Sequence, residues 1–163
     1  MRLQLKFLVD LGSTESGGSV FMNDWADKAL KRIEDRRINQ RNQDEVFLEK
    51  QRIKRAQGFP LWLEVRKHVE ANCSDFNLKA GTQMLVFEVT PDSELLVRAS
   101  IDGSTRTLHA NFKDSTGELS FFCGAHSGHW ILEATTDGKA QFIGSSRTSS
   151  TEQVAEQMLT SLV

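Results

Sequence analysis

The chain has 163 residues, with 20 Lys or Arg against 22 Asp or Glu, so its formal net charge is only −2. A nearly neutral chain has no overall attraction to nucleic acid, and no apolar run approaches the roughly 20 residues that a membrane-spanning helix needs. Two cysteines are too few for a disulfide framework, which indicates a cytoplasmic protein.

Residues 1–20 are predicted to form a segment of their own. Apolar and polar residues alternate through residues 3–9, which is the pattern of an edge strand. Residues 12–19 (GSTESGGS) instead have the composition of a flexible linker. We therefore expect a flexible or edge-strand segment at residues 1–20, followed by a single α+β domain at residues 21–163.

A first helix is predicted from Asn23, a good N-cap residue, to Gly58, which is expected to end it. Its beginning carries an apolar stripe, formed by Phe21, Met22, Trp25, Leu30 and Ile33. In residues 34–45 only Ile38 is apolar, so this stretch is expected to be a solvated helix or a flexible interruption.

A second helix is predicted to begin at Pro60, because a proline at the first helical position loses no hydrogen bond. Apolar residues then recur at helical spacing: Trp62, Val65, Val69, Cys73 and Phe76. The two helices make up residues 21–79. A third helix is predicted at residues 150–163. It would begin with a capping box, in which the side chains of Ser150 and Gln153 each accept a hydrogen bond from the other residue's backbone N–H. Both later helices are expected to lie on the apolar face of a sheet.

Six strands are predicted in residues 82–144, because six short segments alternate apolar and polar residues. Asp102-Gly103 favours a type I′ turn, which would pair Ile101 with Ser104. A four-residue turn at residues 114–117 would place Phe112 opposite Leu119.

A three-residue loop at residues 137–139 is preferred to a two-residue loop. It places Ala140 and Phe142 on the same face as Trp130, whereas the shorter loop would turn that strand over.

The predicted fold is therefore α+β, an antiparallel six-stranded β-meander with one face covered by helices, in the order α-α-β6-α. A strand at the N-terminus would precede this order. The order is similar to that of the helix-grip proteins of the START type, and this resemblance implies an apolar cavity between sheet and helices. Aromatic side chains that would line such a ligand pocket, or simply form the core, are Phe87, Phe112, Phe121, Trp130 and Phe142.

The second face of the sheet is not fully polar. Apolar residues on it are Met84, Val86, Leu96, Phe122 and Ile131. This face is expected either to be covered in part or to form a contact surface.

Basic residues outnumber acidic ones in residues 24–67, whereas the chain is acidic from Gly81 onward. The first helix is therefore our main candidate for a binding element in a non-enzymatic interaction protein, which would meet a protein partner or a second copy. Its candidate contact residues are Arg36, Arg37, Ile38 and Arg41. Acidic residues are interspersed and no aromatic series accompanies them, so we do not expect nucleic acid as the partner.

Cys123, His126 and His129 lie close together in the sequence, and thiolate and imidazole are good zinc ligands. These residues would form a site for a metal-assisted enzyme or, as a Cys–His pair, a nucleophile. The alternative is a glycine-rich hairpin with two solvated histidines, since no fourth ligand is nearby. The chain has no phosphate-binding glycine loop and no GxSxG motif, and we expect no cofactor.

Overall fold

The computed structural model describes the backbone of residues 19–88, 90–145 and 147–163, and the side chains of these ranges from Asp24 onward. The strand considered for residues 3–9 lies outside the described residues. Contacts within the chain divide it into two units, Met1–Asp44 and Glu45–Val163, and each is described by itself. The assignment of residues 21–163 to one domain stays a prediction.

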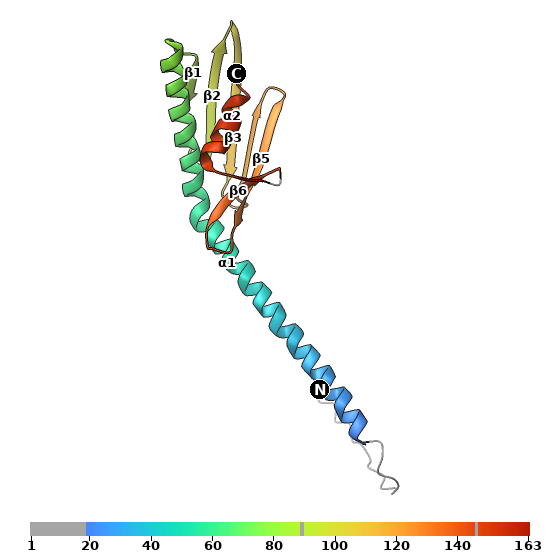
Figure 1. Cartoon of the computed structure of the whole chain (residues 1–163). Coiled ribbons are helices and arrows are strands. Elements are labelled where there is room, and N and C mark those ends of the chain that lie inside the picture. The colour runs from blue at the N-terminus through green and yellow to red at the C-terminus, as the bar shows by residue number, and fades with distance from the viewer. Residues whose placement is uncertain (1–18, 89, 146) are drawn as a thin grey trace, which may run out of the picture. The chain divides into compact units, whose positions relative to one another are not determined.

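One long helix precedes a seven-stranded antiparallel sheet and a short final helix, so the α+β class is confirmed (Figure 1). The helices are α1 (Ser19–Ala80) and α2 (Thr151–Thr160). The strands are β1 (Leu85–Glu88), β2 (Glu94–Ile101), β3 (Ser104–Lys113), β4 (Glu118–Cys123), β5 (His126–Ala134), β6 (Ala140–Gly144) and β7 (Arg147–Ser149).

The prediction of two separate helices is wrong, because α1 continues through Gly58 and Pro60. Asn23 likewise lies inside the helix rather than at its cap. A Cβ at Gly58 would lie 2.9 Å from Leu132 Cδ2 and 3.3 Å from Phe112 Cζ. The missing side chain of Gly58 therefore allows the helix to pack close to the sheet. Pro60 removes one backbone hydrogen bond from the helix but does not end it.

The sheet is a simple meander in which each strand pairs with the next along the chain. Ile101 pairs with Ser104 across the first tight turn, where Asp102 and Gly103 both have positive φ (48° and 78°), as a type I′ turn requires. Phe112 lies opposite Leu119. The strand register predicted from alternation and turn residues is thus confirmed at both turns.

Leu132 pairs with Phe142, so β6 presents Ala140 and Phe142 on the face of Trp130, as predicted. The predicted loop bounds, residues 137–139, are wrong, because Ala134 pairs with Ala140 and Thr135 N donates to Lys139 O. The seventh strand was not predicted. Its three residues, Arg147–Ser149, contain no apolar side chain and so carry no alternation, yet they pair with β6.

Both helical parts of the Glu45–Val163 unit cover the same face of the sheet. Buried residues from α1 are Trp62, Val65, Val69 and Cys73, and those from α2 are Val154, Ala155 and Met158. They pack against the inward residues of all strands from β1 to β6. Trp62 stacks on Phe112 with ring centroids 5.9 Å apart. The predicted capping box of α2 is present, with Ser150 Oγ accepting from the Gln153 N–H.

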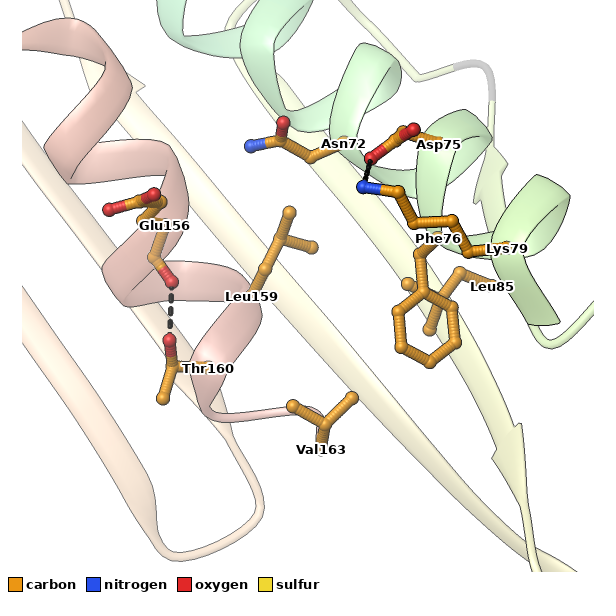
Figure 2. A pocket seen from close by; sticks show the side chains of 9 residues that line it. All are labelled: Asn72, Asp75, Phe76, Lys79, Leu85, Glu156, Leu159, Thr160 and Val163. Carbon is orange, nitrogen blue, oxygen red and sulfur yellow. Dashed lines mark hydrogen bonds and ion pairs between the residues drawn. The ribbon is translucent and has the colours of Figure 1, made fainter.

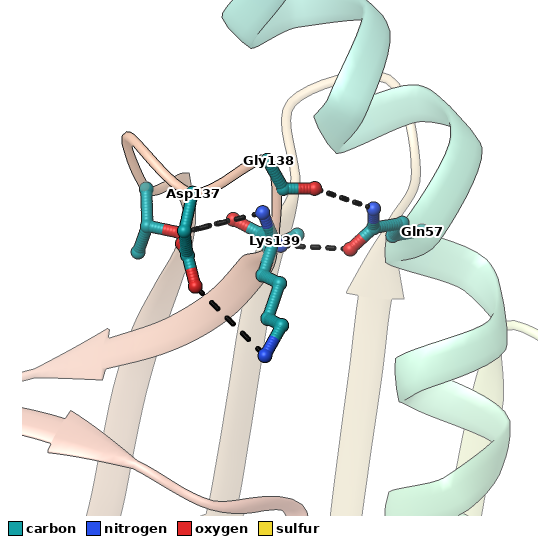
Figure 3. Close-up of polar contacts among 6 residues, drawn as sticks. Gln57, Asp137, Gly138 and Lys139 are labelled. Atoms are coloured by element: carbon teal, nitrogen blue, oxygen red, sulfur yellow. Dashed lines mark hydrogen bonds and ion pairs between the residues drawn. The ribbon is translucent and has the colours of Figure 1, made fainter.

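Polar side chains anchor α1 to the sheet at two places. Gln57 forms two hydrogen bonds with the β5–β6 hairpin: its Nε2 donates to Gly138 O at 3.0 Å, and its Oε1 accepts from Ala140 N at 2.8 Å (Figure 3). Near the end of α1, Asn77 Oδ1 accepts from the N–H groups of Met84 and Leu85, both at 2.8 Å. These bonds satisfy backbone groups that the strand ladder leaves open.

The same hairpin holds an exposed polar cluster. The Thr135 hydroxyl donates to the Asp137 carboxylate, and this hydrogen bond, supported by Lys139, lowers the pKa of Asp137 (Figure 3). The Asp137 contribution to the hairpin is therefore present above the ordinary aspartate pKa and lost as the pH falls through the lowered one.

Candidate functional site

Residues 24–44 of α1, here called the exposed helix segment, belong to the Met1–Asp44 unit. Every side chain in this segment is exposed except that of Ala29, which is half-buried. Trp25 is 74% exposed, Leu30 64%, Ile33 46% and Ile38 48%. Large apolar side chains are thus open to water along a helix that buries none of them.

Three of these residues share one side of the helix. Each residue turns an α-helix by about 100°, so Trp25, Leu30 and Ile33 fall within an arc of about 140°. The same arc passes through Arg36 and Arg37 about one turn further along. Ile38 lies outside it. One face therefore begins apolar and ends basic.

Ion pairing along the exposed helix segment is sparse. Lys28 Nζ lies 2.6 Å from Asp24 Oδ2, and Gln40 donates to Asp44 at 2.9 Å. Within the described residues no ion pair is formed by the arginines of the segment, Arg32, Arg36, Arg37 and Arg41. Their guanidinium groups are available for carboxylates of another molecule.

The five aromatic residues predicted to line a pocket are divided by the structure. Phe112 and Phe142 meet edge to face in the core at 6.3 Å, and Phe87 is half-buried against it. Phe121 and Trp130 belong to the same core, stack on each other with centroids 5.5 Å apart and also line a cavity of about 550 Å³.

The structure brings two of the three predicted metal ligands to adjacent positions, because Cys123 pairs with His126 across β4 and β5, but His129 pairs with Ser120. Cys123 is buried, and its thiol contacts Ser161 O at 3.5 Å. His126 and His129 are three residues apart on β5, so their side chains lie on opposite faces of the sheet. Among the described residues no group of three or more His, Cys, Asp or Glu could hold a metal ion. The metal and the Cys–His hypotheses stay predictions.

The second thiol is also buried. Burial, with a smaller effect from Glu70, raises the pKa of Cys73 to about 11. Because the thiolate is the nucleophile, Cys73 is unreactive at neutral pH.

A groove of about 300 Å³ lies between the end of α1 and α2, over β1 (Figure 2). Phe76, Leu85 and Leu159 supply its apolar lining, and the ion pair between Lys79 Nζ and Asp75 Oδ2, at 2.6 Å, lies on its rim. The groove offers a small apolar surface, and apart from that ion pair its lining carries one carboxylate, that of Glu156.

Apolar side chains on the outer face of the sheet are exposed to water, and its use as a contact surface stays a prediction. Val86, Phe122 and Ile131 are exposed, and the His109 ring packs on that of Phe122 with centroids 5.0 Å apart. Both helical parts of the Glu45–Val163 unit lie on the other face. Across the strands Val86 lies opposite Arg98, and Phe122 lies opposite His109 and Ser127, whereas Ile131 lies opposite another apolar residue, Ile143.

In the part of the chain that the structure describes, no helix combines the length and the apolar character needed to cross a bilayer. Comparison of the chain with family models, with curated proteins and with solved structures found no significant match.

Proposed function

We propose that this protein is a non-enzymatic interaction module, and that the exposed helix segment binds an acidic partner protein. The observation that supports the proposal is the exposure of Trp25, Leu30 and Ile33 on one side of a helix. Exposed apolar side chains in such a row are typical of helices that dock into a groove of a partner.

The residue types suit a binding surface. Tryptophan and arginine are the residues that most often dominate the binding energy of protein interfaces. Here Trp25 lies about three turns before Arg36 and Arg37 on the same arc. A partner that fits would have an apolar groove followed by carboxylates.

Two other partners fit less well. Asp24, Asp27, Glu34 and Asp35 lie among the basic residues and would repel a phosphate backbone. A second copy in parallel register would bring Arg36 and Arg37 beside the same arginines, which is unfavourable for like charges. A protein partner avoids both repulsions if its carboxylates lie only beside Arg36 and Arg37, which a continuous phosphate backbone cannot arrange.

A photo-crosslinking amino acid at Ala26, inside the apolar arc, tests the proposal in cells, with the same group at exposed Thr105 of β3 as the control. A partner joined from position 26 and absent from position 105 is then purified, and its affinity is measured by calorimetry. We expect Trp25→Ala to weaken binding by about 10- to 100-fold and Arg36→Glu with Arg37→Glu to weaken it further at low salt.

The proposal fails if Trp25→Ala binds the purified partner as tightly as the unchanged protein. It also fails if sedimentation shows a dimer that Leu30→Ala dissociates, because the helix would then bind its own copy.

We further propose that the protein works in the cytoplasm. Cys73 and Cys123 are both free and buried, which supports a reducing compartment. Cell fractionation with an antibody to the chain checks this, and recovery outside the cytoplasm would contradict it.

A further inference from the structure

A second site lies within the Glu45–Val163 unit, in the cavity of about 550 Å³ beside Phe121 and Trp130. Its walls come from four strands, the link between the last two and the final helix. The lining residues are Phe121, Ser127, Gly128, His129, Trp130, Gly144, Ser145, Arg147, Ser149 and Gln157. This volume is in the range of small-molecule sites.

The aromatic wall of the cavity depends on two glycines. Gly128 pairs directly with Phe121, and a Cβ on Gly128 would overlap the Phe121 ring. A Cβ on Gly144 would overlap the Trp130 ring in the same way. Both rings therefore lie against bare backbone and stack on each other with an angle of 25° between their planes.

Two polar groups in this wall have no partner among the described residues. Trp130 is only 3% exposed, yet its indole N–H donates to no described group, and the hydroxyl of Ser149, 8% exposed, forms no such bond either. By contrast, Trp62 Nε1 donates to Asp92 O at 2.6 Å. Among the described residues no fully buried side-chain N or O atom lacks a hydrogen-bond partner, so these two groups are open to the cavity and are available to donate to a ligand there.

The charge of the lining selects the ligand. Arg147 is a cation, and no Asp or Glu lines the cavity, although the chain after Gly81 is acidic overall. The indole N–H, the guanidinium and the serine hydroxyls can all donate hydrogen bonds. The hydrogen-bond donors and the positive charge of Arg147 suit the anionic group of a small ligand, and the aromatic rings beside them suit a planar apolar part of the same ligand.

We propose that this cavity binds a small planar organic anion. The anionic group is held by Arg147, Ser149 and the Trp130 indole N–H, and the planar part lies against Phe121 and Trp130. This site is separate from the exposed helix segment, so either proposal can fail without the other.

The test is a titration followed by ¹H–¹⁵N spectra of the full chain. Its three indole signals, from Trp25, Trp62 and Trp130, are assigned with Trp→Phe variants. The probes are sodium benzoate, phenyl phosphate and, as the neutral analogue, benzyl alcohol. We expect saturable shifts of the Trp130 indole and the Gly128 amide with one or both anions, and none of the Trp62 indole.

Arg147→Gln should weaken binding of the anion at least tenfold, whereas Lys113→Gln, which removes a cation outside the cavity, should not change it. Saturation by benzoate alone or by phenyl phosphate alone identifies carboxylate or phosphate as the anionic group. The absence of any saturable shift up to roughly 10 mM, where millimolar affinities are still detected, overturns the proposal. Equal affinity for benzyl alcohol, or an unchanged affinity of Arg147→Gln, overturns it as well.

Discussion

Two stretches of α1 show how differently one helix can be stabilised. In residues 58–77 a row of side chains is buried on the sheet, and Trp62 has no exposed surface. In the exposed helix segment the helical backbone is the same, yet Trp25 is 74% exposed.

The difference teaches that helix formation and helix burial are separate properties. Residues 58–77 gain stability from apolar burial, about 25 cal/mol per Å² of surface removed from water. The exposed helix segment is held only by its backbone, by helical propensity and by local pairs such as Lys28–Asp24, each of which contributes a few tenths of a kcal/mol. Its apolar face is thus free for another molecule.

Truncation of one tryptophan in each stretch tests most strongly whether the two stretches contribute differently to stability. Trp62→Ala removes a fully buried ring, its stacking on Phe112 and its bond to Asp92 O, so it should cost about 3–5 kcal/mol of unfolding free energy. Trp25→Ala should change it by less than about 0.5 kcal/mol. Urea unfolding followed by circular dichroism measures both, and equal losses would refute the comparison.

The polar anchor at the end of the packed stretch should have the next largest effect. Asn77→Ala leaves two strand N–H groups without their acceptor, which should cost about 2 kcal/mol. Asn72→Ala, an identical change at an exposed position of the same helix, is the control and should be nearly neutral. A similar unfolding midpoint for both variants would show that the anchor contributes nothing.

Gly128→Ala tests the aromatic wall of the cavity. The added methyl group overlaps the Phe121 ring, so the ring must move, and overpacking of this kind should cost about 1–2 kcal/mol. Ser127→Ala, next to it on β5 and exposed, should be nearly neutral. If Gly128→Ala instead stabilises the protein in urea, the ring does not lie where the structure places it.

The reactivity of Cys73 tests the burial of the packed stretch without a substitution. Because its pKa is raised from 9.0 to about 11, its thiolate fraction at pH 7 falls from about 10⁻² to about 10⁻⁴. Native protein should therefore react with a thiol reagent at Cys73 about 100-fold more slowly than urea-unfolded protein does. The folded state also loses stability as the pH rises from 9 toward 11, since the unfolded chain releases this proton first. Rapid labelling of native Cys73 would contradict its burial.

The strands and their register could be predicted from the sequence, because they are determined by neighbouring residues. Alternation assigns each side chain to a face, and Asp102-Gly103 sets the pairing of Ile101 with Ser104. The continuous helix was not predictable, because Gly58 looks like a stop signal until Leu132 and Phe112 are seen beside it. Tertiary contact decides the role of that glycine.

The ligand pocket named from the sequence stays a prediction. Phe112, Phe121, Trp130 and Phe142 were all chosen as aromatic residues on an inward face, and all four are buried in the core, but of these four only Phe121 and Trp130 also line the cavity. Arg147 and Ser149 belong to β7, a strand without an apolar signal. Only the register of β6 with β7 brings them to the aromatic pair, and no local pattern encodes it.

Hydrogen exchange of the isolated protein, read by mass spectrometry along α1, tests the central contrast most directly. The account predicts that amides of residues 62–76 open only with global unfolding, whereas those of residues 24–44 exchange at least 100-fold faster. Equal, strong protection of both stretches in the absence of any partner would show that the exposed helix segment is already covered, and would contradict the account.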